Sequence, residues 1–255
     1  MAKVICITNQ KGGVGKTTST ACLAAGYRSL GNRVLCIDFD PQANLSFSCG
    51  TTNEEGNATI YDVVKGQCDA PGAIMRASST FDMIPSNILL SGIELEFTNT
   101  GREYLLREAL QPIMDRYDYI LIDTPPALGI LTVNALTACD YVIIPMLADI
   151  FSLQGIAQLA ETISRVKTYC NAKIKVEGIL LTKYNSRTIL SREIKRITEM
   201  IASDMHTDVF RTAIRSSVVL MEVQANQENI LDYVNKHTAI DDYMRLVNEL
   251  TERGV

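Results

Sequence analysis

The chain has 255 residues, of which 47% are hydrophobic and 21% charged, and its formal net charge is −5. This composition excludes a largely disordered chain, and the length favours one large domain over two. No stretch approaches the ~18 apolar residues of a membrane span. The seven cysteines form no CxxC pair, and several lie in apolar runs, which indicates a reducing compartment and by default the cytoplasm.

Short apolar runs predict the strands of a parallel sheet. In chain order they are residues 4–8, 33–38, 117–123, 140–145 and 177–182. Runs without polar alternation are typical of strands buried on both faces, and the segments between them, such as 105–113 and 153–166, have helical spacing. We therefore expect a doubly wound α/β fold, a mainly parallel sheet flanked by helices on both faces, in a single domain of residues 1–255. Because the first strand begins near Lys3, we expect no helix-turn-helix domain before it.

Two further segments stand outside this alternation. Residues 49–80 are rich in small and polar residues and predict an excursion with one or two short helices. Residues 238–255 predict a helix that begins with a capping box of Thr238 and Asp241. Its apolar residues at helical spacing are Ile240, Tyr243, Met244, Val247 and Leu250. Because its polar face is mostly acidic, we expect this helix to pack on the domain and not on an anionic membrane.

Residues 8–20, TNQKGGVGKTTST, contain a variant of the phosphate-binding loop, between a predicted strand and a predicted helix. Its glycines let backbone N–H groups point at phosphate oxygens, and the start of the helix adds its positive dipole end. Lys16 is placed to reach the β- and γ-phosphates, and Thr17 to bind Mg²⁺. The usual pattern begins with a glycine where this chain has Gln10, and an additional lysine, Lys11, precedes the glycines.

Two acidic motifs follow predicted strands. CIDFDPQAN places Asp38 and Asp40 just beyond one strand, and YILIDTPP places Asp123 at the end of another. Ligands of doubly wound folds bind at the carboxyl edge of the sheet, so we expect these carboxylates beside the phosphate loop. Asp123 has the arrangement of a Walker B carboxylate, which holds Mg²⁺ directly or through water. The three motifs predict one Mg-nucleotide site.

The motifs KGGVGKTT, DFDPQAN, ILIDTPP and TKYNSRTILSRE together resemble the ParA/Soj family of DNA-partition ATPases, which belongs with MinD to the deviant Walker ATPases. The resemblance covers nearly the whole chain. It implies an ATPase with ATP and Mg²⁺ as cofactors, which forms a face-to-face homodimer on ATP binding and binds DNA non-specifically. It further implies stimulation by a ParB-type centromere-binding protein, no membrane partner, and a cytoplasmic, nucleoid-associated location.

The resemblance also implies roles for individual residues. Lys11 crosses the dimer interface to the partner's phosphates, Lys16 acts within its own chain, and Asp40 positions or activates the attacking water. The implied catalytic residues are thus Lys11, Lys16 and Asp40, and the implied metal set is Thr17, Asp40 and Asp123. The implied nucleotide contacts are Lys11, Gly12, Gly13, Val14, Gly15, Lys16, Thr17, Thr18, Arg215 and Ser217.

The adenine contacts come from a motif that departs from the family. Where relatives commonly read IPRNVRLSEA, residues 214–223 read IRSSVVLMEV, so Arg215 takes the place of the proline and Ser216 that of the arginine. In relatives the proline and the asparagine approach the adenine. Arg215 and Ser217 are thus assigned to adenine only because they occupy the positions of that proline and asparagine.

A basic segment of the sequence bears on which related function, such as DNA binding, the chain has. Residues 165–215 hold eleven Lys or Arg against five acidic residues. The candidate DNA-binding residues are Arg187, Arg192, Lys195, Arg196 and Arg215, of which the middle three share one helical face. Charge alone fits equally well a solvated helix in which Lys195 pairs with Glu199. The resemblance favours contacts with DNA phosphates.

Other functions of the same phosphate machinery are alternatives. A MinD-like membrane-positioning ATPase needs a basic, strongly apolar C-terminal helix, which the acidic residues 240–255 do not supply. A nitrogenase-iron-protein-like carrier needs two cysteines per subunit, and Cys139 has no second cysteine in a matching setting. A metabolic P-loop enzyme, such as an amide ligase, would carry a substrate pocket that the sequence does not reveal.

Overall fold

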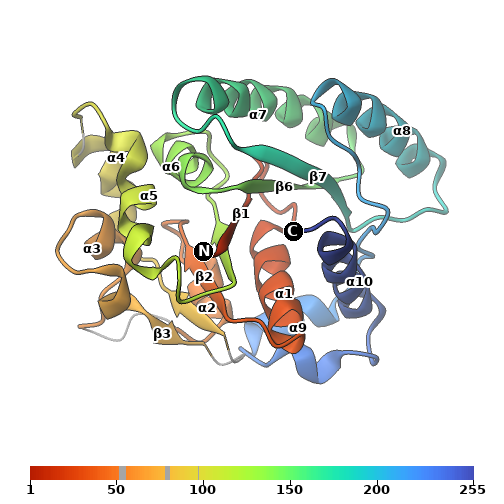
Figure 1. Ribbon diagram of the computed structural model, residues 1–255. Coiled ribbons are helices and arrows are strands. Elements are labelled where there is room, and N and C mark those ends of the chain that lie inside the picture. The colour runs from red at the N-terminus through yellow and green to blue at the C-terminus, as the bar shows by residue number, and fades with distance from the viewer. Residues whose placement is uncertain (52–55, 78–80, 97) are drawn as a thin grey trace.

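The computed structural model describes residues 1–51, 56–77, 81–96 and 98–255. Its centre is a sheet of order β3-β4-β2-β5-β1-β6-β7 (Figure 1). The strands are β1 (Lys3–Ile7), β2 (Val34–Asp38), β3 (Met75–Arg76), β4 (Asp82–Ile84), β5 (Tyr119–Asp123), β6 (Tyr141–Leu147) and β7 (Lys175–Thr182). Among the strands of the described residues, only β3 pairs antiparallel, with β4. All five predicted strands are confirmed, and the short β3 and β4 extend the sheet at one edge.

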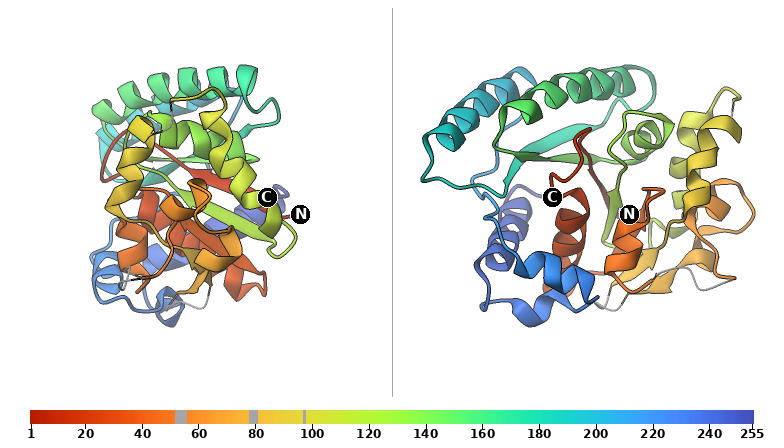
Figure 2. Two further views of the ribbon diagram at one scale, coloured as in Figure 1. Left: turned by 90° about the vertical axis from the view of Figure 1, so that its left-hand side faces the viewer. Right: turned by 180° about the vertical axis from the view of Figure 1, so that it is seen from behind.

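Helices cover both faces of this sheet (Figures 1 and 2). They are α1 (Lys16–Ser29), α2 (Asn44–Ser48), α3 (Ile60–Val64), α4 (Ile93–Glu96), α5 (Leu105–Leu110), α6 (Ile130–Ala138), α7 (Ile150–Tyr169), α8 (Ile189–Asp204), α9 (Val219–Ala225) and α10 (Thr238–Glu252). The part of the chain that the structure describes also contains the 3₁₀ turns η1 (Ala70–Ala73), η2 (Ile88–Gly92), η3 (Arg102–Tyr104), η4 (Gln111–Ile113) and η5 (Ile230–Tyr233). One face carries α1, α2, α9 and α10, and the other carries α3 to α8. The predicted doubly wound fold is confirmed.

The strands are apolar throughout because both of their faces are covered. Along β1, Val4 and Cys6 join the hydrophobic core on one side of the sheet, while Ile5 and Ile7 join the core on the other side. All four side chains are at most 1% exposed. This two-sided burial is the physical reason for the uninterrupted apolar runs.

The predicted helical segments are largely as expected. The excursion at 49–80 contains α3, which begins with a capping box of Thr59 and Asp62, and the turn η1. The parts of that excursion at 52–55 and 78–80 lie outside the described residues. The helix predicted at 105–113 ends as an α-helix at Leu110 and continues as η4, because Pro112 has no N–H group to continue the α-helical pattern.

The C-terminal helix α10 packs against α1, as predicted. The two helices approach closely at Gly26, where an added Cβ would lie 2.6 Å from Cγ2 of Val247. The predicted capping box is wrong: α10 begins with His237 in the N-cap position, so Thr238 is already the first helical residue. The carboxylate of Asp241 instead accepts a hydrogen bond from the backbone N–H of Asn235 at 2.7 Å, which removes it from the capping role.

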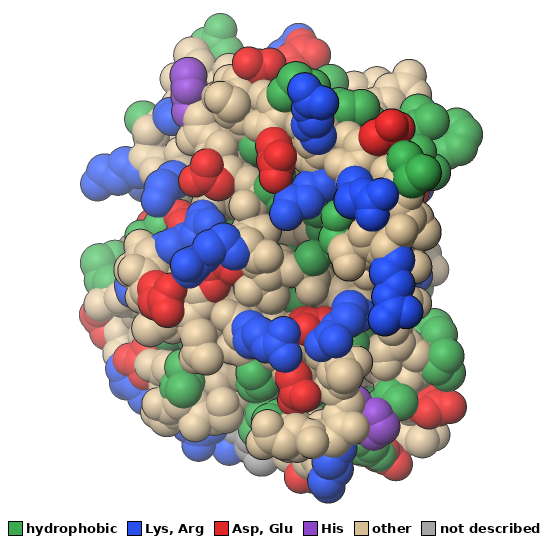
Figure 3. Space-filling model, turned by 90° about the vertical axis from the view of Figure 1, so that its right-hand side faces the viewer, with side chains coloured by type: hydrophobic (Ala, Val, Ile, Leu, Met, Phe, Trp, Pro, Cys, Tyr) green, Lys and Arg blue, Asp and Glu red, His purple; other side chains and the backbone are tan. Residues whose placement is uncertain are grey.

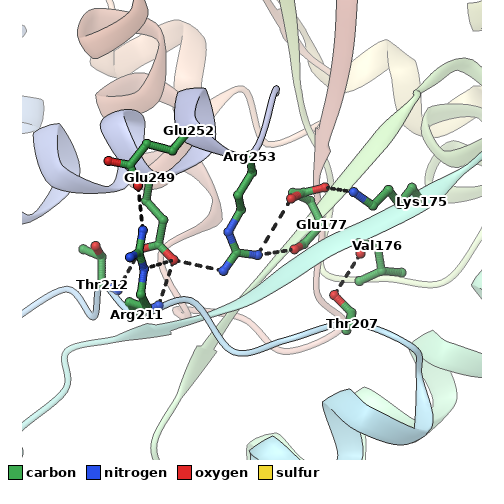
Figure 4. A network of polar contacts seen from close by, with 9 residues as sticks. All are labelled: Lys175, Val176, Glu177, Thr207, Arg211, Thr212, Glu249, Glu252 and Arg253. Atoms are coloured by element: carbon green, nitrogen blue, oxygen red, sulfur yellow. Dashed lines mark hydrogen bonds and ion pairs between the residues drawn. The ribbon is translucent and has the colours of Figure 1, made fainter.

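A network of charged side chains joins the end of α10 to β7 (Figure 4). Glu249, which is 4% exposed, accepts hydrogen bonds from the backbone N–H groups of Arg211 and Thr212, both at 2.9 Å. Arg253 pairs with Glu249 at 3.0 Å and donates to the carbonyl of Glu177 at 3.1 Å. Burial raises the pKa of Glu249, but these bonds outweigh it and hold the pKa below its ordinary value. The buried carboxylate is therefore compensated on both sides.

Candidate functional site

The glycine-rich loop connects β1 to α1 at the carboxyl edge of the sheet. Gly13 and Gly15 have φ angles of 71° and 87°, a left-handed conformation that glycine adopts without steric cost. Gly15 is also the N-cap of α1, so the unpaired N–H groups of the first helical turn face the loop. The loop forms one wall of a pocket of about 490 Å³. This geometry is that of a phosphate-binding loop.

Lys16 lines this pocket. The residue is 7% exposed, and its Nζ donates to the carbonyl of Lys11 at 3.1 Å. Burial lowers the pKa of Lys16, while the nearby carboxylates of Asp123 and Asp40 oppose this change. A buried ammonium with one carbonyl partner gains most from an anion. Its placement fits a phosphate in the loop.

Thr17 and Asp123 form the candidate metal site. The hydroxyl of Thr17 donates to Oδ2 of Asp123 at 2.7 Å. The other oxygen, Oδ1 of Asp123, is buried and accepts no hydrogen bond from any of the residues that the structure describes. Burial, together with the charge of Asp38, raises the pKa of Asp123 well above its ordinary value. A hydroxyl beside an unsatisfied carboxylate oxygen is a donor set that fits Mg²⁺.

Asp38 is the last residue of β2, and Asp40 follows the strand on the neighbouring side of the pocket. Asp40 lines the pocket and accepts a hydrogen bond from the N–H of Gln42 at 2.9 Å. Asp38 is fully buried, where it accepts from the N–H and the hydroxyl of Ser46 at 2.8 and 2.7 Å and from the N–H of Asp40 at 3.2 Å. Burial raises the pKa of Asp38 to about 6, although these hydrogen bonds oppose it. Asp38 thus fixes the backbone that carries Asp40.

Lys11 is held outside the pocket. Its Nζ lies 2.8 and 2.7 Å from the two carboxylate oxygens of Asp149 and 3.2 Å from the hydroxyl of Ser152. Asp149 is the N-cap of α7 and accepts from the N–H of Ser152 at 2.8 Å. Burial raises the pKa of Asp149, but the hydrogen bonds from Lys11 and Ser152 prevail and lower it. The two lysines of the loop therefore have different surroundings, and sequence reasoning missed Asp149.

A second cavity of about 140 Å³ adjoins the first and shares four lining residues with it. Arg215 and Ser217, the positions implied for adenine contacts, both line this cavity. The guanidinium of Arg215 forms two hydrogen bonds of 2.8 Å to the buried carboxylate of Asp242. Between the two cavities, the hydroxyl of Thr18 donates to Gln224 of α9 at 3.0 Å. The structure thus brings the implied adenine positions next to the phosphate loop.

The candidate DNA-binding residues fall into two groups. Arg192, Lys195 and Arg196 lie on α8, and Arg187 lies in the loop before it. Lys195 is 3.9 Å from Glu199, a long contact between exposed side chains that contributes little. Arg215 is separate from this group, since its charge is paired with Asp242.

Figure 3 shows the face of the molecule on the side of α8 and α10, where Lys and Arg side chains surround a hollow with acidic side chains among them. No helix in the described residues has both the length and the apolar character needed to cross a membrane.

The sequence and the fold of this chain both have matches among known proteins. Residues 2–176 match a family model described as an AAA domain. The chain is 37% identical to the sporulation initiation inhibitor protein Soj of Bacillus subtilis over 256 residues, a match that covers 100% of both chains.

Two solved structures show the same fold with nucleotide bound. Cobyrinic acid a,c-diamide synthase from Mycobacterium smegmatis, with ADP and magnesium, is 32% identical with a TM-score of 0.86, and the match covers 99% of this chain and 95% of that one. A protein of Borrelia burgdorferi described as a plasmid partition protein, bound to AMPPNP, is 26% identical with a TM-score of 0.83. That match covers 99% of this chain and 100% of the other. These ligands agree with the ATP and Mg²⁺ expected from the sequence. The chain belongs to the ParA/Soj family, within the ParA/MinD superfamily of P-loop proteins.

Proposed function

We propose that this protein is a DNA-partition ATPase in which ATP joins two copies of the chain. The loaded dimer binds DNA non-specifically, and hydrolysis, stimulated by a ParB-type centromere-binding protein, releases it. The observation that carries this proposal is the separation of the two lysines. Lys16 lies in the pocket, whereas Lys11 is held 2.7 Å from Asp149 outside it. Because Lys11 is not directed at the nucleotide of its own chain, it is available to contact the nucleotide of a partner chain.

The residues of the pocket have distinct tasks in hydrolysis. The loop N–H groups and Lys16 bind the phosphate chain, and Thr17 and Asp123 hold Mg²⁺, which neutralises charge on the β- and γ-phosphates. Asp40 lines the same pocket and is nearly buried, so it is placed to orient the attacking water. The backbone bonds to Asp38 keep Asp40 in this position before nucleotide arrives.

Dimer formation and nucleotide binding form one linked equilibrium in this proposal. Lys11 of one copy contacts the phosphates of the other, so the ATP-loaded dimer has contacts that neither monomer has. A cation supplied by a second subunit stabilises the charge of the transition state, and arginine fingers of this kind contribute about 10³ to 10⁵ in rate. ATP is then a switch for assembly.

DNA binding is assigned to the exposed basic side chains at and before α8. Arg187, Arg192 and Arg196 are exposed, and no ion pair with a carboxylate forms at these three within the described part of the chain. Contacts of this kind are made to phosphates, so binding is independent of base sequence and weakens steeply with salt. The proposal places the protein in the cytoplasm, associated with the nucleoid.

Sedimentation velocity tests the dimer. Lys11→Ala is expected to bind nucleotide as a monomer and to form no dimer with ATP. Asp40→Ala, a substitution inside the pocket, is expected to accumulate ATP-bound dimer because hydrolysis is slowed. ATP-dependent dimers of the Lys11 variant would contradict the assignment of Lys11, and normal turnover of the Asp40 variant would contradict its role with water.

ATPase assays separate this function from its alternatives. Turnover is measured for the protein alone, with plasmid DNA and a candidate ParB-type partner, and with anionic liposomes. Stimulation by DNA with the partner is expected, and it should fall in a Lys195→Ala/Arg196→Ala variant. Stimulation by liposomes alone would favour a MinD-like function. Turnover that requires an amide donor and a carboxylic acid would favour an amide-forming enzyme, such as the diamide synthase from M. smegmatis.

A further inference from the structure

Lys183 is a cation at the nucleotide pocket that the motifs of the phosphate loop do not include. It follows Thr182, the last residue of β7, and its side chain is exposed. Its φ angle is 49°, in the left-handed region that residues with a Cβ rarely adopt. Unfavourable backbone conformations of this kind persist where the surrounding structure enforces them, and they cluster at functional sites.

The residues on both sides of Lys183 are anchored. The hydroxyl of Thr182 donates to the carbonyl of Val14, in the phosphate loop, at 2.8 Å and to that of Met146 at 3.2 Å. The backbone N–H of Tyr184 donates to the carbonyl of Ile214 at 2.9 Å. The turn is therefore tied to the phosphate loop on one side and to the 214–217 segment on the other. The backbone of Lys183 is therefore held at the edge of the pocket.

The side chain of Lys183 lies over the phosphate loop. Its Nζ is 3.4 Å from the carbonyl of Gly13, a long hydrogen bond. Lys183 lines both the larger pocket and the smaller cavity beside Arg215. Within the described residues no carboxylate pairs with Lys183, whereas Lys11 is neutralised by Asp149 and Arg215 by Asp242. An ammonium without a carboxylate thus stands where the two cavities meet.

We propose that Lys183 is a nucleotide-binding residue whose ammonium contacts the phosphate chain of a nucleoside diphosphate or triphosphate held in its own chain's loop. The inference rests on the proposed function, because it requires nucleotide in that loop. Mg-ATP retains negative charge, and Lys16 is placed inside the pocket to meet it. Lys183 adds a second cation from the same chain. The monomer can then hold nucleotide before a partner supplies Lys11.

Three substitutions separate charge from backbone conformation. Lys183→Gln removes the charge and keeps most of the length, Lys183→Arg keeps the charge, and Lys183→Gly removes the charge but accepts the left-handed backbone. Lys173→Gln, at another exposed lysine, is the matched control for net charge. Affinity for a fluorescent ADP analogue is measured by titration at protein concentrations where the chain is monomeric. Thermal melting without nucleotide verifies that each variant is folded.

We expect the Gln and Gly variants to bind ADP about 10- to 100-fold more weakly, the range for one charged hydrogen bond, while Arg and the control stay within a few-fold of the unmodified chain. The loss should be larger for ADP than for adenosine. Unchanged ADP affinity in Lys183→Gln or Lys183→Gly, or an equal loss for adenosine, would overturn the assignment of Lys183 alone. Failure of the unmodified chain to bind ADP would instead overturn the proposed function, and this inference with it.

Discussion

The ion pair between Lys11 and Asp149 predicts a substitution that strengthens the proposed dimer. If Lys11 must leave Asp149 to reach the partner's nucleotide, the ion pair opposes assembly. Asp149→Asn removes the negative charge, while asparagine remains a good N-cap and can still accept from the N–H of Ser152. The start of α7 is therefore retained. We expect Asp149→Asn to form the ATP-dependent dimer at lower protein concentration.

The magnitude follows from the exposure of the pair. The side chains of Lys11 and Asp149 are 29% and 33% exposed, so the pair is partly screened by solvent. Exposed ion pairs contribute about 0.2–1 kcal/mol to stability, and hydrogen bonds to charged groups contribute about 1.5–3 kcal/mol. We take about 1 kcal/mol for the pair of Lys11 and Asp149. Two pairs break per dimer, so the substitution should favour dimerisation by about 2 kcal/mol, roughly 30-fold in the dissociation constant.

The assay is sedimentation velocity with saturating ATP, in an Asp40→Ala background, in which we expect slow hydrolysis. Asp69→Asn is the matched control, because Asp69 is the N-cap of η1 and has no part in the site. Since the pKa of Asp149 is below its ordinary value, the carboxylate is charged at every pH above about 3.9, and the effect should be constant from pH 6 to 8. An unchanged dimer would refute the restraining role of Asp149, and a weaker dimer would place Asp149 among the contacts of the dimer itself.

The remaining predictions concern binding and stability. Lys16→Ala should abolish binding of the fluorescent ADP analogue, and near-normal affinity would contradict its place in the pocket. Gly26→Ala should lower the free energy of unfolding by about 1–3 kcal/mol in urea titrations, because the new Cβ overlaps Val247; no change would mean that α1 and α10 can separate without cost. Glu249→Gln should destabilise the chain at pH 7. Folding lowers the pKa of Glu249, so the stabilising effect of its carboxylate is present above about pH 4.3 and is lost as the pH falls through the folded pKa. The difference in the free energy of unfolding between the variant and the unmodified chain should therefore shrink on acidification. A difference that stays constant would exclude the carboxylate charge as its cause.

The centre of the site was predictable because each of its parts is local and the topology joins them. Lys16 and Thr17 belong to one contiguous motif at the start of α1, and Asp38 and Asp123 each end a buried apolar strand. In the parallel sheet β5 lies between β1 and β2, and Asp123 is in register with both Ile7 and Asp38. Strand ends that are far apart in the sequence therefore meet at one edge.

The other contacts depend on distances that no local pattern encodes. Asp149 lies 138 residues from Lys11, and as an aspartate before a helix it looks like an ordinary N-cap. The left-handed turn at Lys183 arises from anchors in two other segments, although sequence reasoning included its neighbourhood in a family motif. β4 is three residues long, too short for an apolar run to stand out. Tertiary context decides in each of these cases.

The arrangement of the lysines implies an order of events in the proposed cycle. Lys16 and Lys183 can meet phosphate without a partner, so nucleotide loading needs no dimer. Lys11 can contribute only by exchanging the carboxylate of Asp149 for the phosphates of the nucleotide in a second chain. That exchange is favourable only where this nucleotide carries enough negative charge. ATP carries one more phosphate than ADP. The loss of this charge on hydrolysis weakens the attraction for Lys11 but not the competing ion pair, so we expect the same contact to make assembly depend on ATP and to favour disassembly afterwards.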